Sequence, residues 1–221
     1  VEICEQAPEI GEVGAGIQLS PNAMRVMRAL GLEAEVRTAG FEPEALEFRD
    51  GHTGARVFAI TVGPEAERRW GAPYLHIHRA DLVEILRRSL EIRAPGAIHL
   101  HARAVGYERK ANGRAALILS SGGQIEGDAL IGADGLHSAI RTQMLGLESP
   151  RFTGFVAWRG VVPVDTLGAH VPPPTACLWA GAGRHAVTYR VRGGALANFV
   201  GVVEHDDPGE ESWGRRGVRT D

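Results

Sequence analysis

The sequence has 221 residues, of which 44% are hydrophobic and 23% are charged, and its formal net charge is −3. This length suffices for one large domain or two small ones, while the weak acidity gives no electrostatic reason to expect nucleic acid or an anionic membrane as a partner. No apolar run approaches the roughly 20 residues of a membrane-spanning helix, so the composition indicates a globular protein outside the membrane.

The first predicted element is a strand at Val1–Glu5, in which apolar residues lead to an acid. In dinucleotide-binding folds, an acid at the end of the second strand accepts hydrogen bonds from ribose hydroxyls. The Gly-rich phosphate loop of such a fold lies about 20 residues before this acid. That loop would precede Val1. Taken alone, Glu5 is more simply explained as a solvated strand end.

A helix is predicted next, with Ser20 as its N-cap, Pro21 as its first residue and Gly31 as its stop signal. Just before this helix, Gly14 and Gly16 flank a small residue. Glycine lets a flat ligand or a phosphate approach the backbone closely. A Gly-rich connector without a ligand is the alternative, and spacing alone does not exclude it.

Strand and helix signals then alternate as far as residue 150. A second helix is predicted at 33–39, two strands around a turn within 44–62, and a strand leading into a helix within 74–90. Four further strands are predicted within 97–101, 104–110, 114–121 and 124–134. The two strands within 44–62 interrupt the α/β pattern, which indicates an excursion into another layer.

Two polar residues lie where predicted strands meet predicted helices. Arg79 could bind a phosphate with its planar guanidinium, although a surface ion pair with Asp81 is the simpler alternative. Asp134, which Gly135 follows, ends an apolar strand, and open α/β sheets bind ligands at such strand ends. A tight turn with Asp134 as a helix cap is the alternative.

All predicted elements after Arg151 are strands, within 154–164, 175–181, 184–193 and 195–205. In the third of them, alternation places four side chains on one face: His185, Val187, Tyr189 and Val191. One imidazole and one phenol among apolar residues suit an aromatic acid. A hydrogen-bonded structural histidine is the alternative for His185.

Five segments in order carry a family resemblance: EQAPEIGEVGAGIQLSPNAMRVMRALGL, HRADL, LIGADGLHSAIR, FVAWRGVVP and LWAGAGRHAVTYRVRGG. Together they resemble the FAD-dependent aromatic monooxygenases, the single-component flavoprotein hydroxylases. Within that family they are most similar to the branch of salicylate hydroxylase and 3-hydroxybenzoate 6-hydroxylase. The resemblance extends over nearly the whole chain.

The resemblance implies a mixed α/β (α+β) chain with the p-hydroxybenzoate hydroxylase-like fold. A partial, Rossmann-like FAD-binding domain would comprise 1–40 and 73–150, without its first strand and Gly-rich loop. A β-rich substrate domain, incomplete at its C-terminal end, would comprise 41–72 and 151–221. The family's second flavin motif would follow Asp221, so we expect a partial chain that is inactive by itself.

The resemblance also assigns cofactor roles, position by position. Glu5 matches the ribose-binding acid, and Ala15, Gly16 and Ile17 match the loop along the isoalloxazine. Arg79 matches the arginine near the FAD pyrophosphate. Asp134 and Gly135 match the family's Asp-Gly motif, which is associated with the pyrophosphate and with the reduced nicotinamide. NADH or NADPH would bind only transiently.

On the substrate side, the resemblance makes His185 and Tyr189 the catalytic pair. His185 would take the phenolic proton of the substrate, a task that suits an imidazole whose ordinary pKa is about 6.5. Gln18 and Trp158 are weaker candidates for the substrate pocket.

His76 with His78, and His99 with His101, have spacings that could bind a metal, but no third ligand is marked, so no metal site is expected.

The function implied by the resemblance is hydroxylation of a phenolic or other aromatic acid with FAD, NAD(P)H and oxygen, through a flavin hydroperoxide. A homodimer is compatible with it. Two cysteines, Cys4 and Cys177, form no Cys-x-x-Cys pair, which favours the cytoplasm. The alternative is a truncated, non-catalytic remnant, or an association module, that no longer holds flavin.

Overall fold

The computed structural model describes residues 1–11, 15–147, 149–206 and 209. By its contacts the chain divides into two compact units, 1–10 with 87–152 and 11–86 with 153–221. We call them the small-sheet unit and the large-sheet unit. The domain division predicted from the sequence concerns binding roles and stays a prediction. By contacts alone, residues 11–40 and 73–86 group with the large sheet.

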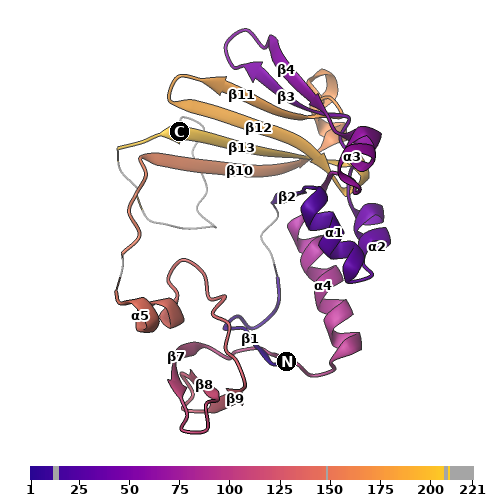
Figure 1. Cartoon of the computed structure of the whole chain (residues 1–221). Helices are drawn as coiled ribbons and strands as arrows, with labels where there is room; N and C mark the ends of the chain where they lie inside the picture. The colour runs from indigo at the N-terminus through magenta and orange to yellow at the C-terminus, as the bar shows by residue number, and fades with distance from the viewer. Residues whose placement is uncertain (12–14, 148, 207–208, 210–221) are drawn as a thin grey trace. The chain divides into compact units, whose positions relative to one another are not determined.

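The large-sheet unit contains a six-stranded sheet in the order β10-β13-β12-β11-β3-β4 (Figure 1). Neighbouring strands are antiparallel except β11 and β3, which are parallel. The strands are β3 (Ala45–Asp50), β4 (Arg56–Thr61), β10 (Phe155–Pro163), β11 (Ala176–Gly181), β12 (Arg184–Val191) and β13 (Leu196–Glu204). Each lies within a strand predicted from the sequence.

Directly paired residues share a face of a sheet, so the register defines two faces. We call the side that carries Tyr189 the Tyr189 face. Three rows across β12, β13 and β10 lie on it: His185, Val202 and Ala157; Val187, Val200 and Arg159; Tyr189, Asn198 and Val161. The opposite side, which carries Glu47, Cys177 and Thr188 in one row, is the Glu47 face.

A helical layer and a two-stranded sheet complete the large-sheet unit. The elements are β2 (Gly16–Leu19), α1 (Pro21–Ala29), α2 (Glu33–Ala39), α3 (Gly63–Trp70), β5 (Leu75–His78) and the first half of α4 (Arg79–Arg93). β2 pairs antiparallel with β5, and α1 and α2 pack against this pair. Fully buried Met24, Val36, Leu75 and Ile77 form the centre of the core.

Two details of this layer differ from the sequence prediction. Ser20 is the N-cap residue of α1, but its hydroxyl meets the Asn22 side chain at 2.5 Å and makes no hydrogen bond to the helix amides. Pro21, as the first helical residue, removes one of the amides of the first turn that have no partner within the helix. Helix α3 was not predicted, although Pro64 and Glu65 are typical of a helix start.

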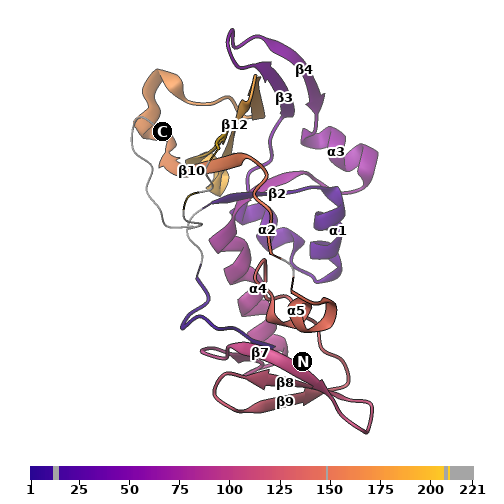
Figure 2. The same ribbon diagram turned by 90° about the vertical axis from the view of Figure 1, so that its left-hand side faces the viewer.

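The small-sheet unit has two sheets. β1 (Ile3–Cys4) pairs in parallel with β6 (Ile98–His99), while β7 (Ala104–Arg109), β8 (Ala115–Leu119) and β9 (Gln124–Gly127) form an antiparallel sheet (Figure 2). α5 (Ala139–Leu145) packs on β7. There the Gln143 amide accepts the Tyr107 N–H and donates to the Tyr107 carbonyl, both at 2.7 Å.

The predicted strand that ends at Asp134 is wrong beyond β9. Residues 128–135 form no strand, and Ile131 is 89% exposed. An apolar segment becomes a buried parallel strand only where neighbours complete its hydrogen bonds, and none of the described strands pairs with this one. The strand predicted within 97–101 shrinks to two residues because His101 has a left-handed backbone, with φ of 53°.

Two 3₁₀ helices, Val164–His170 and Arg192–Gly194, follow strands β10 and β12. The second is tied to α4 by Arg192, whose guanidinium donates to both carboxylate oxygens of Asp81 at 2.9 and 2.8 Å. Of the helices in the described ranges, none is both long and apolar enough to cross a membrane.

Candidate functional site

The start of β2 lies directly against β12 in the large-sheet unit. A Cβ atom on Gly16 would be 2.4 Å from Cε2 of Tyr189 and 2.8 Å from its hydroxyl, so only glycine allows this contact. The Gly16 N–H donates to Oδ1 of Asn198 at 2.8 Å, and Asn198 faces Tyr189 across β12 and β13. Two segments far apart in sequence are thereby held together.

Tyr189 is 5% exposed, and its environment keeps the phenol protonated. Burial raises the pKa of Tyr189 to about 12, with a further contribution from Tyr74, while the positive charge of Arg159 acts in the opposite direction. At neutral pH its hydroxyl is therefore available as a hydrogen-bond donor.

His76 on β5 is fully buried beside this tyrosine. Its ring lies 4.7 Å from the ring of Tyr189 and 6.5 Å from that of Phe41, and Tyr74 meets it edge-on at 5.8 Å. Burial lowers the pKa of His76 to about 4, against a weak opposing effect of the Arg190 backbone. The imidazole is thus neutral at physiological pH.

Several buried polar atoms around Tyr189 lack a partner. Among the described residues, no hydrogen bond of normal geometry reaches Nδ1 or Nε2 of His76, or Nδ2 of Asn198. Buried polar groups in folded proteins are almost always satisfied, by protein, water or ligand. These three atoms therefore mark a place where a further hydrogen-bonding group belongs.

The predicted flavin loop and the predicted phosphate arginine are neighbours. The Arg79 N–H donates to the Ala15 carbonyl at 2.9 Å, and Gly16 pairs with His78 in the β2–β5 ladder. Ile17 continues β2. The structure thus brings Ala15, Gly16, Ile17 and Arg79 together, while Gly14, the other glycine of the motif, lies outside the described residues.

The two residues predicted for the substrate pocket, Gln18 and Trp158, lie in different surroundings. Gln18 is paired with His76 in the ladder, and its Oε1 accepts the Tyr74 hydroxyl at 2.8 Å, so it belongs to the surroundings of Tyr189. Trp158 pairs with Gly201 and lies on the Glu47 face, opposite His185 and Tyr189. The sheet brings Gln18 and Tyr189 into one neighbourhood and leaves Trp158 on the other side.

Glu5 lies at the end of β1 in the small-sheet unit. Its Oε1 accepts the Ala7 N–H at 2.8 Å, and no described residue donates to its Oε2. The backbone of Glu5 continues the parallel ladder by donating to the His99 carbonyl at 2.9 Å. One carboxylate oxygen at this strand end is accordingly available to a hydroxyl of a ligand.

Asp134 precedes helix α5 in the same unit and holds its first turn. Its carboxylate accepts the Ser138 hydroxyl at 2.5 Å and the Ile140 N–H at 3.2 Å. Burial opposes ionisation, but these bonds lower the pKa of Asp134 on balance. Gly135 follows with φ of 79°, which fits the tight turn. The N-cap residue of α5 is Ser138, whose hydroxyl accepts the Arg141 N–H at 2.9 Å, and Asp134 supports this cap from four residues earlier.

In each unit taken by itself, the available polar groups fit a part of a flavin nucleotide better than a metal. A flavin ring carries carbonyl and imide groups, which match the unpartnered amide of Asn198, and its ribityl and ribose hydroxyls match a carboxylate such as Glu5. No group of three or more His, Cys, Asp or Glu side chains within the described residues is arranged to hold a metal ion.

Three residues of this region were missed in the sequence: His76, Asn198 and Arg159. His76 was considered only as a metal ligand, and Asn198 and Arg159 lie in strands of otherwise ordinary composition. Strand parity is the available signal, since Arg159 and Trp158 must point to opposite faces. The choice between those faces depends on the register with β13, which a single sequence does not give.

Comparisons with known proteins identify the family of this chain. A family model described as FAD binding domain matches residues 6–213. A 3-amino-4-hydroxybenzoate 2-monooxygenase of Streptomyces cremeus is 36% identical over 209 residues, which are 94% of this chain and 52% of that protein. The 3-hydroxybenzoate 6-hydroxylase 1 of Aquipseudomonas alcaligenes is 35% identical over 198 residues, 90% of this chain and 50% of that protein.

Among solved structures, Klebsiella pneumoniae HpxO complexed with FAD and uric acid superposes with a TM-score of 0.79 at 26% identity, covering 95% of this chain and 52% of that one. The chain thus spans about half the length of the relatives it matches. The resemblance and the mixed α/β fold expected from the sequence are confirmed. Since the family model covers most of the sequence, this chain belongs to the FAD binding domain family.

Proposed function

We propose that the protein containing this chain hydroxylates a phenolic or related aromatic acid, using FAD, oxygen and either NADH or NADPH as a transient reductant. One oxygen atom would enter the ring as a hydroxyl and the other would leave as water, while NAD(P)H gives up two electrons. The names of the two curated relatives support the reaction class. The observation that carries the proposal is the packing of Tyr189 on Gly16.

That contact joins β2, whose start is expected to lie along the flavin, to β12, which is expected to hold the substrate. In this proposal Ala15, Gly16 and Ile17 lie along the isoalloxazine, and Arg79 binds near the pyrophosphate. The main-chain bond between Arg79 and Ala15 supports it, because it fixes the arginine at the start of this loop. Bound FAD would supply oxygen activation and transfer, which no side chain can provide.

The family resemblance assigns flavin-binding roles to residues of the small-sheet unit too. Glu5 would accept a ribose hydroxyl with its available Oε2, and Asp134 with Gly135 would lie near the pyrophosphate and the reduced nicotinamide. The intramolecular bonds of Asp134 are compatible with this, because they fix the turn whose backbone would meet the ligand. Residues 1–40 and 73–150 would hold FAD, and residues 41–72 and 151–221 the substrate.

On the substrate side, His185 would take the proton of the substrate's phenol, which makes the ring more electron-rich. Tyr189, which stays protonated, would donate a hydrogen bond and orient the ring. Gln18 would line the pocket through its bond to Tyr74. Trp158, on the Glu47 face, would support the sheet from behind rather than touch the substrate.

The test uses the whole native polypeptide that carries residues 1–221. We expect flavin absorbance to co-elute with the protein in gel filtration, and a hydroxybenzoate or hydroxynicotinate to stimulate NAD(P)H oxidation with formation of a hydroxylated product. Protein that holds no flavin would overturn the proposal and favour a non-catalytic remnant. Gel filtration would also report whether a homodimer forms, and fractionation whether the protein is cytoplasmic.

The role of His185 has a separate test. His185→Ala should leave flavin binding unchanged while hydroxylation falls about 100-fold and more of the oxidised NAD(P)H appears as hydrogen peroxide, because a positioned base contributes about that factor. His52, in the exposed turn between β3 and β4, provides the matched control His52→Ala, which should match wild type. Unchanged coupling in His185→Ala would remove His185 from the active site.

A further inference from the structure

Arg159 lies on the Tyr189 face of the large sheet. It occurs on β10 opposite Val200 of β13, which in turn is opposite Val187 of β12. Val187 is the residue between His185 and Tyr189 on that face. Arg159 is therefore in line with the middle of the predicted catalytic pair, on the far side of an apolar row.

The spacing of this arrangement suits a small ring. Adjacent strands are about 4.8 Å apart and successive residues about 3.3 Å, so the Cα of Arg159 is about 12 Å from those of His185 and Tyr189. Val187 and Val200 form the floor between these three residues. A single aromatic ring on that floor could reach the imidazole, the phenol and the guanidinium together, since all three side chains are long.

The charge pattern of the face indicates what Arg159 meets. In the three rows that contain His185, Val187 and Tyr189, every residue on β10, β12 and β13 is described, and Arg159 is the one permanently charged side chain among them. Glu204 at the end of β13 and Asp50 at the end of β3 also lie on this face, outside that set of residues. Arg159 is exposed, and its positive charge acts on the Tyr189 phenol.

We infer that Arg159 binds the carboxylate of the aromatic substrate and so selects aromatic acids over neutral phenols. The inference rests on the proposed function and adds a specificity-determining residue to it. A guanidinium binds a carboxylate through two parallel hydrogen bonds, which fixes the direction of the ring as well as its charge. With the carboxylate at Arg159, the rest of the ring extends across Val200 and Val187 toward His185 and Tyr189.

The experiment compares acids with their neutral amides in the full-length holoenzyme. The probes are 3-hydroxybenzoate and salicylate, each beside its primary amide, with Kd measured by the change in flavin absorbance and in tryptophan fluorescence. Arg159→Gln should raise Kd and KM for the preferred acid by about 10- to 100-fold, as expected for a lost charge-assisted contact, and those for the amide by less than about 3-fold. Arg159→Lys keeps the positive charge but loses the paired N–H donors of the guanidinium. Its Kd and KM for the acid should lie between those of wild type and of Arg159→Gln.

Arg184 supplies the matched control, because it is an exposed arginine of the same sheet but lies on the Glu47 face. Arg184→Gln should match wild type for acid and amide alike. Equal losses for acid and amide in Arg159→Gln, or a wild-type protein that binds neither acid better than its amide, would overturn the inference. If acid binding depends on Arg159 but no probe is hydroxylated, the inference stands and the proposed function fails.

Discussion

The two faces of the large sheet bury polar groups in opposite ways. On the Glu47 face, the Glu47 carboxylate is 8% exposed and accepts hydrogen bonds from Arg49 at 2.7 Å, from Arg56 at 3.5 Å and from the Cys177 thiol at 3.7 Å. On the Tyr189 face, His76 and Asn198 are as deeply buried, yet three of their polar atoms make no hydrogen bond of normal geometry within the described residues.

The difference separates a structural cluster from a binding surface. The Glu47 cluster joins β3, β4 and β11, and Arg49 also stacks on Trp179 at 5.2 Å, so every charge in it is used to hold strands together. An unsatisfied buried group costs stability, and such groups persist where a ligand or water completes them. The Tyr189 face is therefore the side of the sheet on which function is expected.

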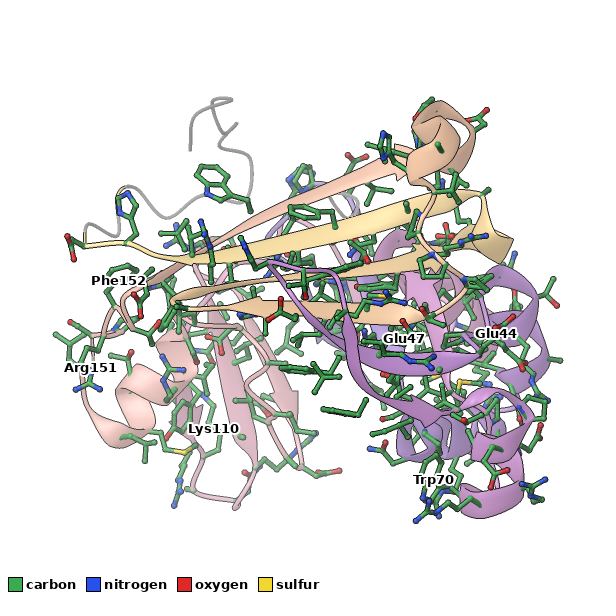
Figure 3. All side chains as sticks on the ribbon, turned by 90° about the horizontal axis from the view of Figure 1, so that it is seen from above. Glu44, Glu47, Trp70, Lys110, Arg151 and Phe152 are labelled. Carbon is green, nitrogen blue, oxygen red and sulfur yellow. The ribbon has the colours of Figure 1, made fainter. Side chains whose placement is uncertain are left out.

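The largest expected effect comes from the Glu47 face. Glu47→Gln leaves Arg49 and Arg56 without their buried anion and should lower the free energy of unfolding by about 3 kcal/mol. Denaturant unfolding measures it. Glu44, which is exposed on the same segment, gives the control Glu44→Gln, expected within about 0.5 kcal/mol of wild type. Both residues are labelled in Figure 3. An equal, small loss in both variants would show that the cluster is not structural.

The same carboxylate has a defined pH dependence. Burial opposes its ionisation, but the bonds and charge of Arg49 lower the pKa of Glu47 on balance. A lowered native pKa means that the stabilisation is present above the unfolded value, about 4.3, and is lost as pH falls through the native value. The stability difference between wild type and Glu47→Gln should therefore shrink below pH 4.

The next effect tests the contact on the Tyr189 face. Gly16→Ala places a methyl group inside the Tyr189 ring, and overpacking of this kind costs about 1–3 kcal/mol. We expect weaker flavin retention as well, because the tyrosine must move or the strand must shift. Gly160→Ala on β10 is the control, since a Cβ atom there meets nothing within 4 Å. Gly16→Ala with wild-type stability and flavin content would contradict the contact.

Local sequence signals predicted most helices and strands well, because the ends of a helix and the alternation of a strand depend on residues that are close in the sequence. Pro21 and Gly31 marked α1, and alternation from Arg184 to Val191 marked β12 and the shared face of His185 and Tyr189. The failure at Ile131 has a different origin. Its apolar segment has the composition of a strand, but a strand also needs partners, and partners are not encoded locally.

The site was predictable in its residue types and not in its contacts. Gly16, Arg79 and Tyr189 were identified by resemblance, but the packing of Tyr189 on Gly16 requires the docking of β2 against β12. Register decided between Trp158 and Arg159, and register depends on hydrogen bonds between strands far apart in the chain. The burial of His76 could not be predicted from its residue type, because histidine is common on protein surfaces too.

The smallest expected effect has the opposite sign and sharpens the comparison most. His76→Phe replaces an unpartnered imidazole with an apolar ring between Phe41 and Tyr189, and it should raise the free energy of unfolding of the flavin-free protein by about 1 kcal/mol. Thermal or urea unfolding at pH 7 measures this. His99→Phe is the control, because His99 is partly exposed and bonded to Glu2, so its loss should not stabilise the protein.

The pH dependence distinguishes this explanation from simple repacking. The native pKa of His76 is about 4, below the ordinary value of about 6.5, so the unfolded chain binds the proton first as pH falls. Wild type should therefore lose up to about 3 kcal/mol between pH 6.5 and 4 that His76→Phe retains. Parallel stability curves for the two proteins would mean that a group on the Tyr189 face already satisfies the imidazole. The contrast between the two faces would then rest on Asn198 alone.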